Sequence, residues 1–240
     1  MGLFITIDGL DGSGKGTQSD LLCAWLREQG YRVKELSFPC YGQKSAIPVE
    51  MYLHGELGAR PEDTNAFAAS AFFSIDRYIS YRTDWKKDAD DPGTVIISNR
   101  YTTANAVHQL SKLPREQWKD FLAWLWDFEF VRLGLPKPDV ILYLEMLPEI
   151  SMRLVEHRSA ETGQKKDIHE LSADHLEKSY QAALYASEAL GWTRLRCFSG
   201  TQPRPIDEIR EEIVNIVKPY LAKTPTDTGI LQEKKGTETI

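Results

Sequence analysis

Short runs of apolar and β-branched residues alternate along the chain with longer stretches in which apolar residues recur every three or four positions. The runs predict about five strands, in LFITID, YRVKELS, TVIIS, DVILYLE and TRLRCF. Between them the periodicity predicts amphipathic helices at residues 18–29, 64–87, 115–132, 173–190 and 206–221. Strands that alternate with helices form parallel sheets with helices on their faces. The pattern therefore predicts an α/β fold whose parallel sheet is flanked by helices.

The length and the end of the chain indicate one domain followed by a tail. The chain has 240 residues, of which 42% are hydrophobic, which is enough for one substantial core. From Lys223 the sequence KTPTDTGILQEKKGTETI is polar and has no periodicity. We therefore expect a single domain over residues 1–222 and a mobile tail over residues 223–240.

Charge and cysteine content exclude several classes of protein. A formal net charge of -6 gives no general attraction to nucleic acid. Three cysteines without a Cys-x-x-Cys pair favour neither disulfides nor a zinc site, and the five histidines show no spacing typical of one. No apolar run is long enough to cross a bilayer. We expect a cytoplasmic protein that binds no membrane and no nucleic acid.

The segment IDGLDGSGKGTQ carries the pattern Gly-x-x-x-x-Gly-Lys between a predicted strand and a predicted helix. Its glycines allow a tight turn that aims backbone N–H groups at phosphate oxygens, and Lys15 can reach the transferring group. A glycine-rich turn that binds nothing is the alternative. The loop predicts a P-loop NTPase fold, a three-layer sandwich, with ATP as phosphoryl donor. The residues expected to bind ATP here are Gly9, Leu10, Asp11, Gly12, Ser13, Gly14, Lys15, Gly16 and Thr17.

The residue after the lysine is Gly16, where many NTPases have a hydroxyl that binds magnesium, and the hydroxyl is displaced to Thr17. A nucleotide kinase tolerates this change, because Mg²⁺ keeps several waters and takes oxygens from the substrate phosphates. A switch GTPase depends on that hydroxyl more, and no Asn-Lys-x-Asp guanine motif occurs. The loop therefore resembles those of adenylate-kinase-type nucleotide kinases that use Mg²⁺.

Four further blocks follow in order, namely SFPCYGQKSA, AFFSIDRYISYR, IISNRYTTANAVHQ and LPKPDVILYLE. Together with the loop they resemble thymidylate kinases over most of residues 1–221. The resemblance implies transfer of the ATP γ-phosphoryl group to dTMP, giving dTDP and ADP. It also implies a homodimer through helices beside the sheet. The aromatic segment EQWKDFLAWLWDFEF fits such an interface, although core packing is the alternative.

The resemblance also implies an acceptor site. It implies that Phe38, Pro39 and Tyr41 close over the nucleotide and that Phe73 stacks on thymine. Arg77 would contact the base and Arg100 the acceptor phosphate. Asn105 and His108 would lie around the base and the deoxyribose. An aromatic face suits a planar base, and a guanidinium fork suits a phosphate. For one of Phe72 and Phe73 the alternative is the core face of a helix.

Two elements of the resemblance concern the transfer itself. Asp11 matches an acidic loop residue near the acceptor sugar and the magnesium, although capping the loop is an alternative role. The segment EHRSAETGQKKDIHE resembles a lid at about residues 158–170, in which Arg158 would contact ATP. Relatives without an arginine in the phosphate loop commonly supply the catalytic cation from the lid. The catalytic set is then Lys15, Arg100, Lys165, Lys166 and Asp11; a solvated basic turn is the alternative for the lid.

Two positions depart from the thymidylate kinase pattern. Many relatives have arginine where this chain has Cys40, and aspartate where it has Asn99. Each change removes a charge from the site. Two alternatives therefore stay open, namely a kinase for another nucleoside monophosphate and a non-catalytic nucleotide-binding protein.

Overall fold

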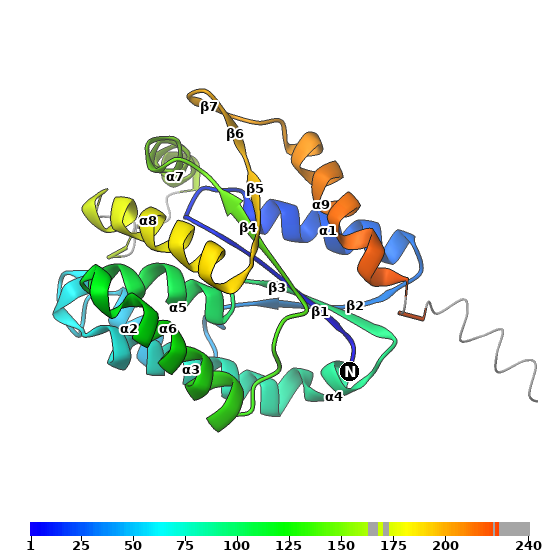
Figure 1. Ribbon diagram of the computed structural model, residues 1–240, viewed down its shortest axis with the longest axis horizontal. Coiled ribbons are helices and arrows are strands. Elements are labelled where there is room, and N and C mark those ends of the chain that lie inside the picture. Colours follow the sequence, from blue (N-terminus) through cyan, green and yellow to red (C-terminus); the bar gives the residue numbers. More distant parts are fainter. Residues whose placement is uncertain (163–167, 170–172, 223, 226–240) are drawn as a thin grey trace, which may run out of the picture.

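The structure is a computed structural model that describes residues 1–162, 168–169, 173–222 and 224–225. At its centre five parallel strands lie in the order β2-β3-β1-β4-β5 (Figure 1). They are β1 (Leu3–Gly9), β2 (Arg32–Ser37), β3 (Thr94–Asn99), β4 (Val140–Glu145) and β5 (Thr193–Arg196). The α/β class and the strands expected from the sequence are confirmed. Two short antiparallel strands follow, β6 (Phe198–Ser199) and β7 (Gln202–Pro203).

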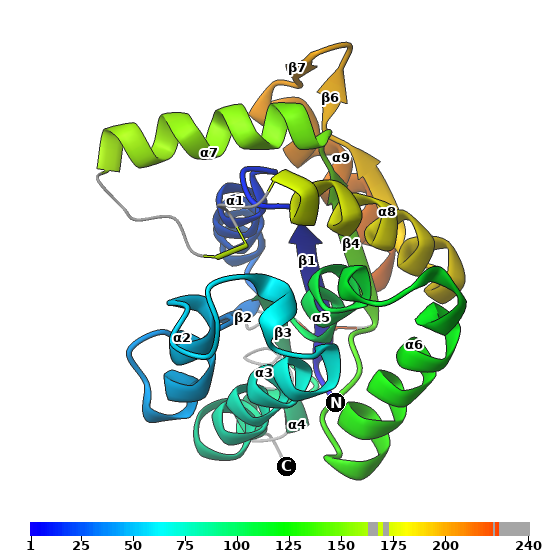
Figure 2. The same cartoon turned by 90° about the vertical axis from the view of Figure 1, so that its left-hand side faces the viewer.

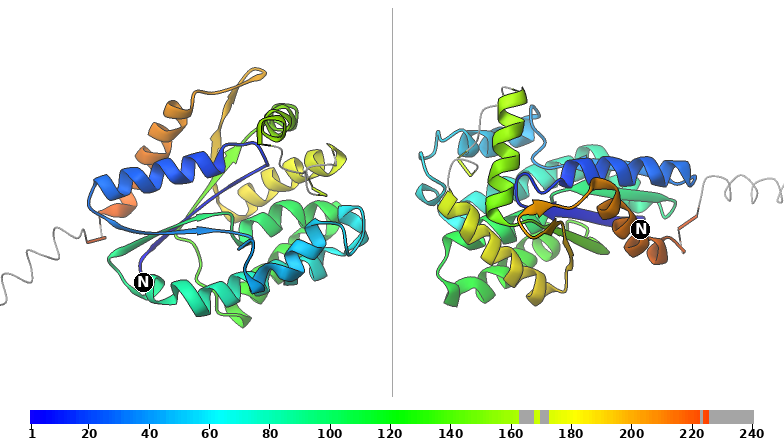
Figure 3. Two further views of the ribbon diagram at one scale, coloured as in Figure 1. Left: turned by 180° about the vertical axis from the view of Figure 1, so that it is seen from behind. Right: turned by 90° about the horizontal axis from the view of Figure 1, so that it is seen from above.

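Helices cover both faces of the sheet, which is the middle of three layers (Figure 3). One face carries α1 (Lys15–Glu28) and α9 (Ile206–Leu221). The helices of the other face are α3 (Ala66–Ser80), α4 (Lys86–Asp90), α5 (Thr102–His108), α6 (Trp118–Trp126) and α8 (Ala173–Leu190). Strand β1 is buried on both sides: Ile5 and Ile7 belong to the core beneath α1 and α9, whereas Phe4 packs edge-on against Trp85 and Tyr101.

Three helices lie outside the helical ranges predicted from the sequence, namely α2 (Ile47–Leu53), α5 and α7 (Pro148–Thr162). Every residue of α5 is buried, the polar ones included, so the helix lacks the exposed polar face that makes a helical period visible. The expected helix at residues 64–87 is interrupted by a π-helical segment at Tyr81–Trp85, and the one at residues 115–132 ends in another at Asp127–Arg132. Most of the expected tail, apart from residues 224–225, lies outside the described residues.

The strand order places a crevice between β1 and β3. The chain leaves β1 through α1 to reach β2 on one side, and leaves β3 through α5 to reach β4 on the other. Ligands of open α/β sheets bind at such a switch point, beyond the carboxyl ends of the strands. Figure 2 shows α7 crossing above this end of β1. The fold therefore directs the end of β1 and the residues after β3 into one space beneath α7.

Candidate active site

A cavity of about 1200 Å³ opens at the carboxyl ends of β1, β2 and β3. This volume exceeds the range of roughly 300–1000 Å³ usual for a pocket that holds one small ligand. Eight residues of the phosphate loop and the start of α1, Asp11 to Gln18, line one part of it. All eight expected acceptor residues, Arg100 included, line it as well. The structure thus brings the donor and acceptor residues named from the sequence into a single cavity.

The phosphate loop adopts a backbone that only glycine fits at several positions. Gly12 and Gly14 have φ of 80° and 85°, in the left-handed region. A Cβ atom on Gly9 would lie 2.4 Å from the Ser13 hydroxyl oxygen, and one on Gly12 would lie 2.7 Å from the Ser151 carbonyl oxygen. Among the described residues, the buried Ser13 hydroxyl has no hydrogen-bond partner. The loop is therefore a preformed cradle that leaves polar groups for a ligand to satisfy.

Two cations share one carboxylate at the centre of the cavity. Lys15 Nζ donates to the Leu10 carbonyl and to Asp11 Oδ1, both at 3.1 Å, and Arg100 pairs with the same Asp11 oxygen. Burial alone would raise the pKa of Asp11, but Arg100 and then Lys15 hold it well below its usual value. Asp11, whose side chain is 18% exposed, is therefore a partly buried anion that keeps the loop lysine and the arginine after β3 side by side.

Arg100 holds its position through an unusual backbone. Its φ is 67°, which no other non-glycine residue shares among those described. Its amide donates to the Ile7 carbonyl at 3.0 Å, and the Ser98 hydroxyl donates to its carbonyl at 2.5 Å. A left-handed backbone at a residue with a Cβ costs about 1–2 kcal/mol and persists where its surroundings fix it. Here it turns the guanidinium across the crevice from β3 toward the phosphate loop.

Phe73 fits both interpretations that the sequence left open. Phe72 and Phe73 both pack on the core cluster between α2 and α3, and Phe73 meets Tyr52 edge-on with centroids 6.1 Å apart. Only Phe73 of the two lines the cavity. Phe38 also lines the cavity, yet it is buried against Tyr101 in the core.

The two positions that depart from the family pattern differ in where they lie. Asn99 lines the cavity, and its buried Oδ1 has no partner among the described residues. Cys40 does not line it: its side chain packs on the core cluster that contains Phe38 and Trp85, and its amide donates to Asp76 at 2.8 Å. Burial, reinforced by Asp76, raises the pKa of the Cys40 thiol to about 11. Cys40 is thus a neutral, partly buried thiol that packs against the core, as a small apolar side chain would.

Three histidines meet at the edge of the cavity although their spacing in the sequence gave no sign of it. One ring nitrogen of each of His108, His169 and His175 lies within 4.8 Å of the other two, and all three side chains are buried. Their centroids are 4.5 to 5.7 Å apart and their planes are inclined by 17° to 32°. Nearly parallel rings direct their in-plane lone pairs alongside one another rather than toward one point. As oriented here, the three rings form a stack and not a tetrahedral metal centre.

The histidine stack is held in the neutral form. Burial is the main cause, and it lowers the pKa of His108 and His169 well below the usual value and that of His175 to about 4. Arg100 donates to His108 Nε2 at 2.9 Å and adds to the depression of that pKa. Burial likewise lowers the pKa of Lys112, beside the stack, to about 7. Protonation of the stack would bring charge into a place that already holds cations.

The lid is described only in part. Arg158, on α7, lines the cavity, as do Ile168 and His169. His169 Nε2 lies 2.7 Å from the Tyr52 hydroxyl, which links this segment to α2. Lys165 and Lys166, the expected catalytic cations of the lid, lie outside the described residues.

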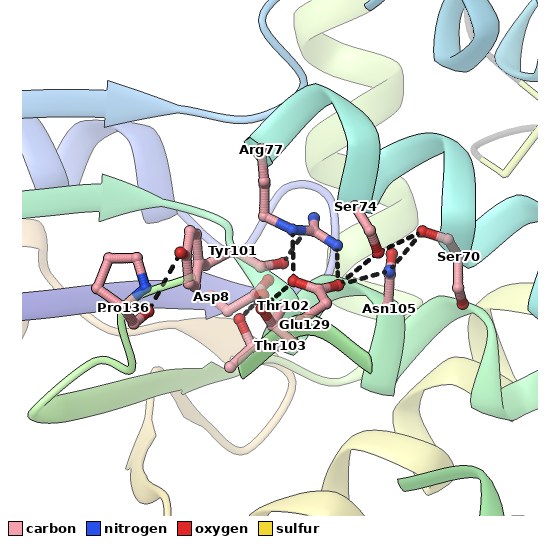
Figure 4. Close-up of polar contacts among 10 residues, drawn as sticks. All are labelled: Asp8, Ser70, Ser74, Arg77, Tyr101, Thr102, Thr103, Asn105, Glu129 and Pro136. Carbon is pink, nitrogen blue, oxygen red and sulfur yellow. Dashed lines mark hydrogen bonds and ion pairs between the residues drawn. The ribbon is translucent and has the colours of Figure 1, made fainter. Parts of the chain in front are cut away.

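One buried acid of the site was not found from the sequence. Glu129, in the π-helical segment after α6, is 0% exposed and pairs with Arg77, which is 1% exposed (Figure 4). Arg77 Nε and Nη2 donate to its two oxygens at 2.9 and 2.5 Å. The only signal in the sequence was an acid within the aromatic run DFEF, and an acid in a helix is typical of a surface position. The pairing partner lies 52 residues away, so local patterns do not reveal it.

Comparisons with known proteins agree with this geometry. The family described as Thymidylate kinase matches residues 7–193. A thymidylate kinase of Mycobacterium tuberculosis is 32% identical over 193 residues, which cover 79% of this chain and 87% of that protein. A thymidylate kinase of Rhodopirellula baltica is 29% identical over 90% of this chain and 80% of its own length. A probable thymidylate kinase of Thermococcus gammatolerans is 29% identical over 68% of this chain and 74% of its own.

Two further observations complete the picture. Within the described ranges, no helix is long and apolar enough to cross a membrane. The match covers the end of β1, the phosphate loop and both arginines, which line or adjoin the cavity. The chain belongs to the thymidylate kinase family.

Proposed function

We propose that this chain transfers the γ-phosphoryl group of ATP to dTMP, giving dTDP and ADP, and that the cavity residues described above do the work. The observation that carries the proposal is the shared contact of Lys15 and Arg100 with Asp11. A donor-side cation and an acceptor-side cation thereby lie within reach of one atom. Phosphoryl transfer needs this arrangement, because its catalysis is mostly positioning and charge stabilisation.

The phosphate loop suits the donor. Backbone N–H groups from Gly9 to Gly14 and the amino terminus of α1 would hold the ATP phosphates, and the free Ser13 hydroxyl adds a donor. Lys15 would leave the Asp11 oxygen and the Leu10 carbonyl for the transferring group. Asn99 and Thr17, which line the cavity beside the loop, fit the same polar environment.

Magnesium fits the site through the nucleotide rather than through a dedicated set of ligands. Gly16 offers no hydroxyl, and the Asp11 oxygen nearest the loop is engaged by two cations. When bound, Mg²⁺ neutralises charge on the phosphates, and it usually keeps several waters. Asp11 is proposed to contribute once Lys15 and Arg100 have turned to the substrates.

The acceptor half follows from the residues around Arg100. Arg100 would grip the dTMP phosphate, Phe73 would stack on the base, and Arg77 with Asn105 would contact its polar edge. Phe38, Pro39 and Tyr41 would cover the nucleotide, with His108 beside the sugar. The acceptor phosphate has a second pKa of about 6 and is largely ionised at pH 7. No general base is then required, and this makes Asn99 compatible with activity.

The lid is proposed to supply further positive charge during transfer. Arg158 lines the cavity and would contact ATP, and Lys165 or Lys166 would stabilise the moving phosphoryl group. Such a cation can contribute roughly 10³-fold or more in rate.

A homodimer is proposed through α3. Four large apolar side chains of this helix are 37% to 44% exposed, namely Phe67, Ile75, Tyr78 and Ile79. Exposed apolar surface on one helix is typical of a subunit interface. Light scattering of the purified protein tests this proposal, and a monomer at micromolar concentration would contradict it.

The function is tested by ADP release in a coupled assay with five acceptors, dTMP, dUMP, dCMP, AMP and GMP, each with Mg·ATP. We expect dTMP to give the highest kcat/KM. A preference for another monophosphate would replace the proposed acceptor, and ADP release independent of any acceptor would refute the kinase. The matched control is the Lys15→Ala variant, which keeps the loop backbone and loses the cation.

A further inference from the structure

Glu129 accepts hydrogen bonds from four residues at once. Ser74 Oγ and Arg77 Nη2 donate to its Oε1 at 2.8 and 2.5 Å, and Thr102 Oγ1 and Arg77 Nε donate to its Oε2 at 2.5 and 2.9 Å. Asn105 Nδ2 lies 3.4 Å from Oε1 (Figure 4). Glu129 itself does not line the cavity, whereas Arg77 and Asn105 do. The carboxylate therefore acts on the cavity only through its neighbours.

The pairing with Glu129 determines which N–H groups of Arg77 remain for a ligand in the cavity. The Nε and one Nη2 hydrogen bond to Glu129, and Nη1 donates to the Tyr101 carbonyl at 3.3 Å. A guanidinium has five N–H donors and cannot accept. One hydrogen on each of Nη1 and Nη2 is left by these contacts. Arg77 thus offers the cavity donors only.

The same carboxylate decides the orientation of the Asn105 amide. Its Nδ2 has two partners, the Ser70 carbonyl at 3.3 Å and Glu129 Oε1 at 3.4 Å. Both partners can only accept, so the amide nitrogen must face them and the amide oxygen must face the other way. Asn105 therefore offers the cavity an acceptor beside the donors of Arg77.

We propose that Glu129 is a positioning residue that sets the hydrogen-bond polarity of the base pocket and so selects 4-keto over 4-amino pyrimidines. This rests on the proposed function, which gives Arg77 and Asn105 to the acceptor base. A 4-keto pyrimidine presents a carbonyl oxygen next to an N3–H, which matches a donor beside an acceptor. A 4-amino pyrimidine presents an amino group next to an unprotonated ring nitrogen. The donors of Arg77 would then face a donor, and the acceptor of Asn105 would face an acceptor.

A carboxylate is the group that this position requires. All its neighbours donate, and a carboxylate only accepts. A glutamine of the same shape would place an NH₂ group against Arg77 or Thr102, and it would leave the buried guanidinium without a counter-charge. Leaving one partner of a buried pair uncompensated is costly, and Arg77 would relax toward other acceptors.

The test is Glu129→Gln, with kcat and KM measured for dTMP, dCMP and ATP. We expect kcat/KM for dTMP to fall roughly 10- to 100-fold, mainly through KM, which corresponds to a charged hydrogen bond of about 1.5–3 kcal/mol. The ratio of kcat/KM for dTMP over dCMP should fall at least tenfold, and KM for ATP should stay within about twofold. The matched control is Glu145→Gln, because Glu145 is also buried but contacts Tyr180 and Arg194 outside the cavity.

A second variant covers the case in which Glu129→Gln does not fold. Thr102→Val is isosteric, does not line the cavity and removes one donor to Glu129. It should shift the dTMP to dCMP ratio in the same direction by a few-fold. If folded variants lower turnover of both acceptors equally and leave the ratio unchanged, Glu129 is only a structural residue and the proposal is wrong.

If the proposed function itself is wrong, the assays give a different result from the one that refutes the role of Glu129. The unmodified chain would then give no dTMP turnover. Calorimetric binding of dTMP and dCMP to the unmodified chain and to Glu129→Gln measures the same selectivity without turnover. A dTMP preference that the variant keeps in full would overturn the inference by this route as well.

Discussion

Stability should fall when the pH is lowered from 7 to 5, because the histidine stack is neutral in the folded protein. His175 is 1% exposed, and burial, with a smaller effect from Lys112, lowers its pKa to about 4. The unfolded chain has an ordinary histidine pKa of about 6.5. Between these values the unfolded state binds the proton and the folded state does not. The stability is therefore full above pH 6.5 and is lost as the pH falls toward 4.

The size of the effect follows from the two pKa values. At pH 5 the unfolded state gains about 2 kcal/mol from protonation of His175 relative to the folded state, given the folded pKa of about 4. His108 and His169 add to the effect in the same direction, because burial lowers both of their pKa values. Asp11 is an acid with a lowered pKa, so its contribution to the free energy of unfolding is lost only near and below its usual pKa of 3.8. Asp11 is thus silent between pH 7 and 5, but Lys112, with a folded pKa of about 7, also titrates there. The variants of His175, and not the pH window alone, therefore isolate the contribution of this histidine.

The assay is urea unfolding followed by tryptophan fluorescence at pH 7, 6 and 5, for the parent and for His175→Gln and His175→Phe. Neither substitute titrates, and Phe keeps a ring in the stack. The free energy of unfolding of each variant should differ from that of the parent by a constant amount and should also depend less on pH. Between pH 7 and 5 it should fall by about 2 kcal/mol less than in the parent. An unchanged pH dependence in both variants would refute the reasoning, because His175 would then titrate alike in the folded and unfolded chain.

The remaining predictions concern the transfer. Lys15→Ala should lower kcat by roughly 10²-fold or more in folded protein, because the loss falls on charge stabilisation; near-normal turnover would rule out the role given to this lysine. Arg100→Ala should raise KM for dTMP far more than KM for ATP, since its fork is assigned to the acceptor phosphate; equal effects on both would show the assignment to be wrong. Replacing Lys165 and Lys166 together by alanine should lower kcat with little change in the dissociation constants of either nucleotide, as for a contact made mainly during transfer; weaker binding with normal kcat would make them surface attractants.

Local patterns predicted the sheet and the phosphate loop because both are written in short stretches of sequence. Strand β1 is a short, mostly apolar run. The loop needs glycine at Gly12 and Gly14 for a left-handed backbone, and at Gly9 because a Cβ would meet Ser13 and Leu144. Helix α5 was missed for the opposite reason, since its polar residues are buried as well and do not mark a solvent-exposed face. The arginine expected to contact the base, Arg77, does line the cavity, but its role is still a prediction.

Contacts between distant segments account for what the sequence did not reveal. Glu129 meets Arg77 across 52 residues, and the histidines of the stack come from α5, α8 and the segment before it. The residue type at position 40 suggested a lost charge in the site, whereas in the structure the Cys40 side chain is partly buried against a core cluster and does not line the cavity. Whether a side chain faces a cavity or a core depends on packing of the whole chain, which residue spacing does not encode.

Asp11 gives the donor and acceptor halves a common dependence. Its carboxylate stays ionised because Arg100 and Lys15 lower its pKa, and it satisfies both cations in the described state. A phosphate that draws one cation away would leave Asp11 with the other alone, and a phosphate on each side would leave a partly buried carboxylate with neither. An anion that is partly removed from water is less stable without a partner, so it attracts a replacement cation. Under the proposed function, magnesium that arrives with ATP would be such a cation, and Asp11 would then favour metal binding once both nucleotides are bound.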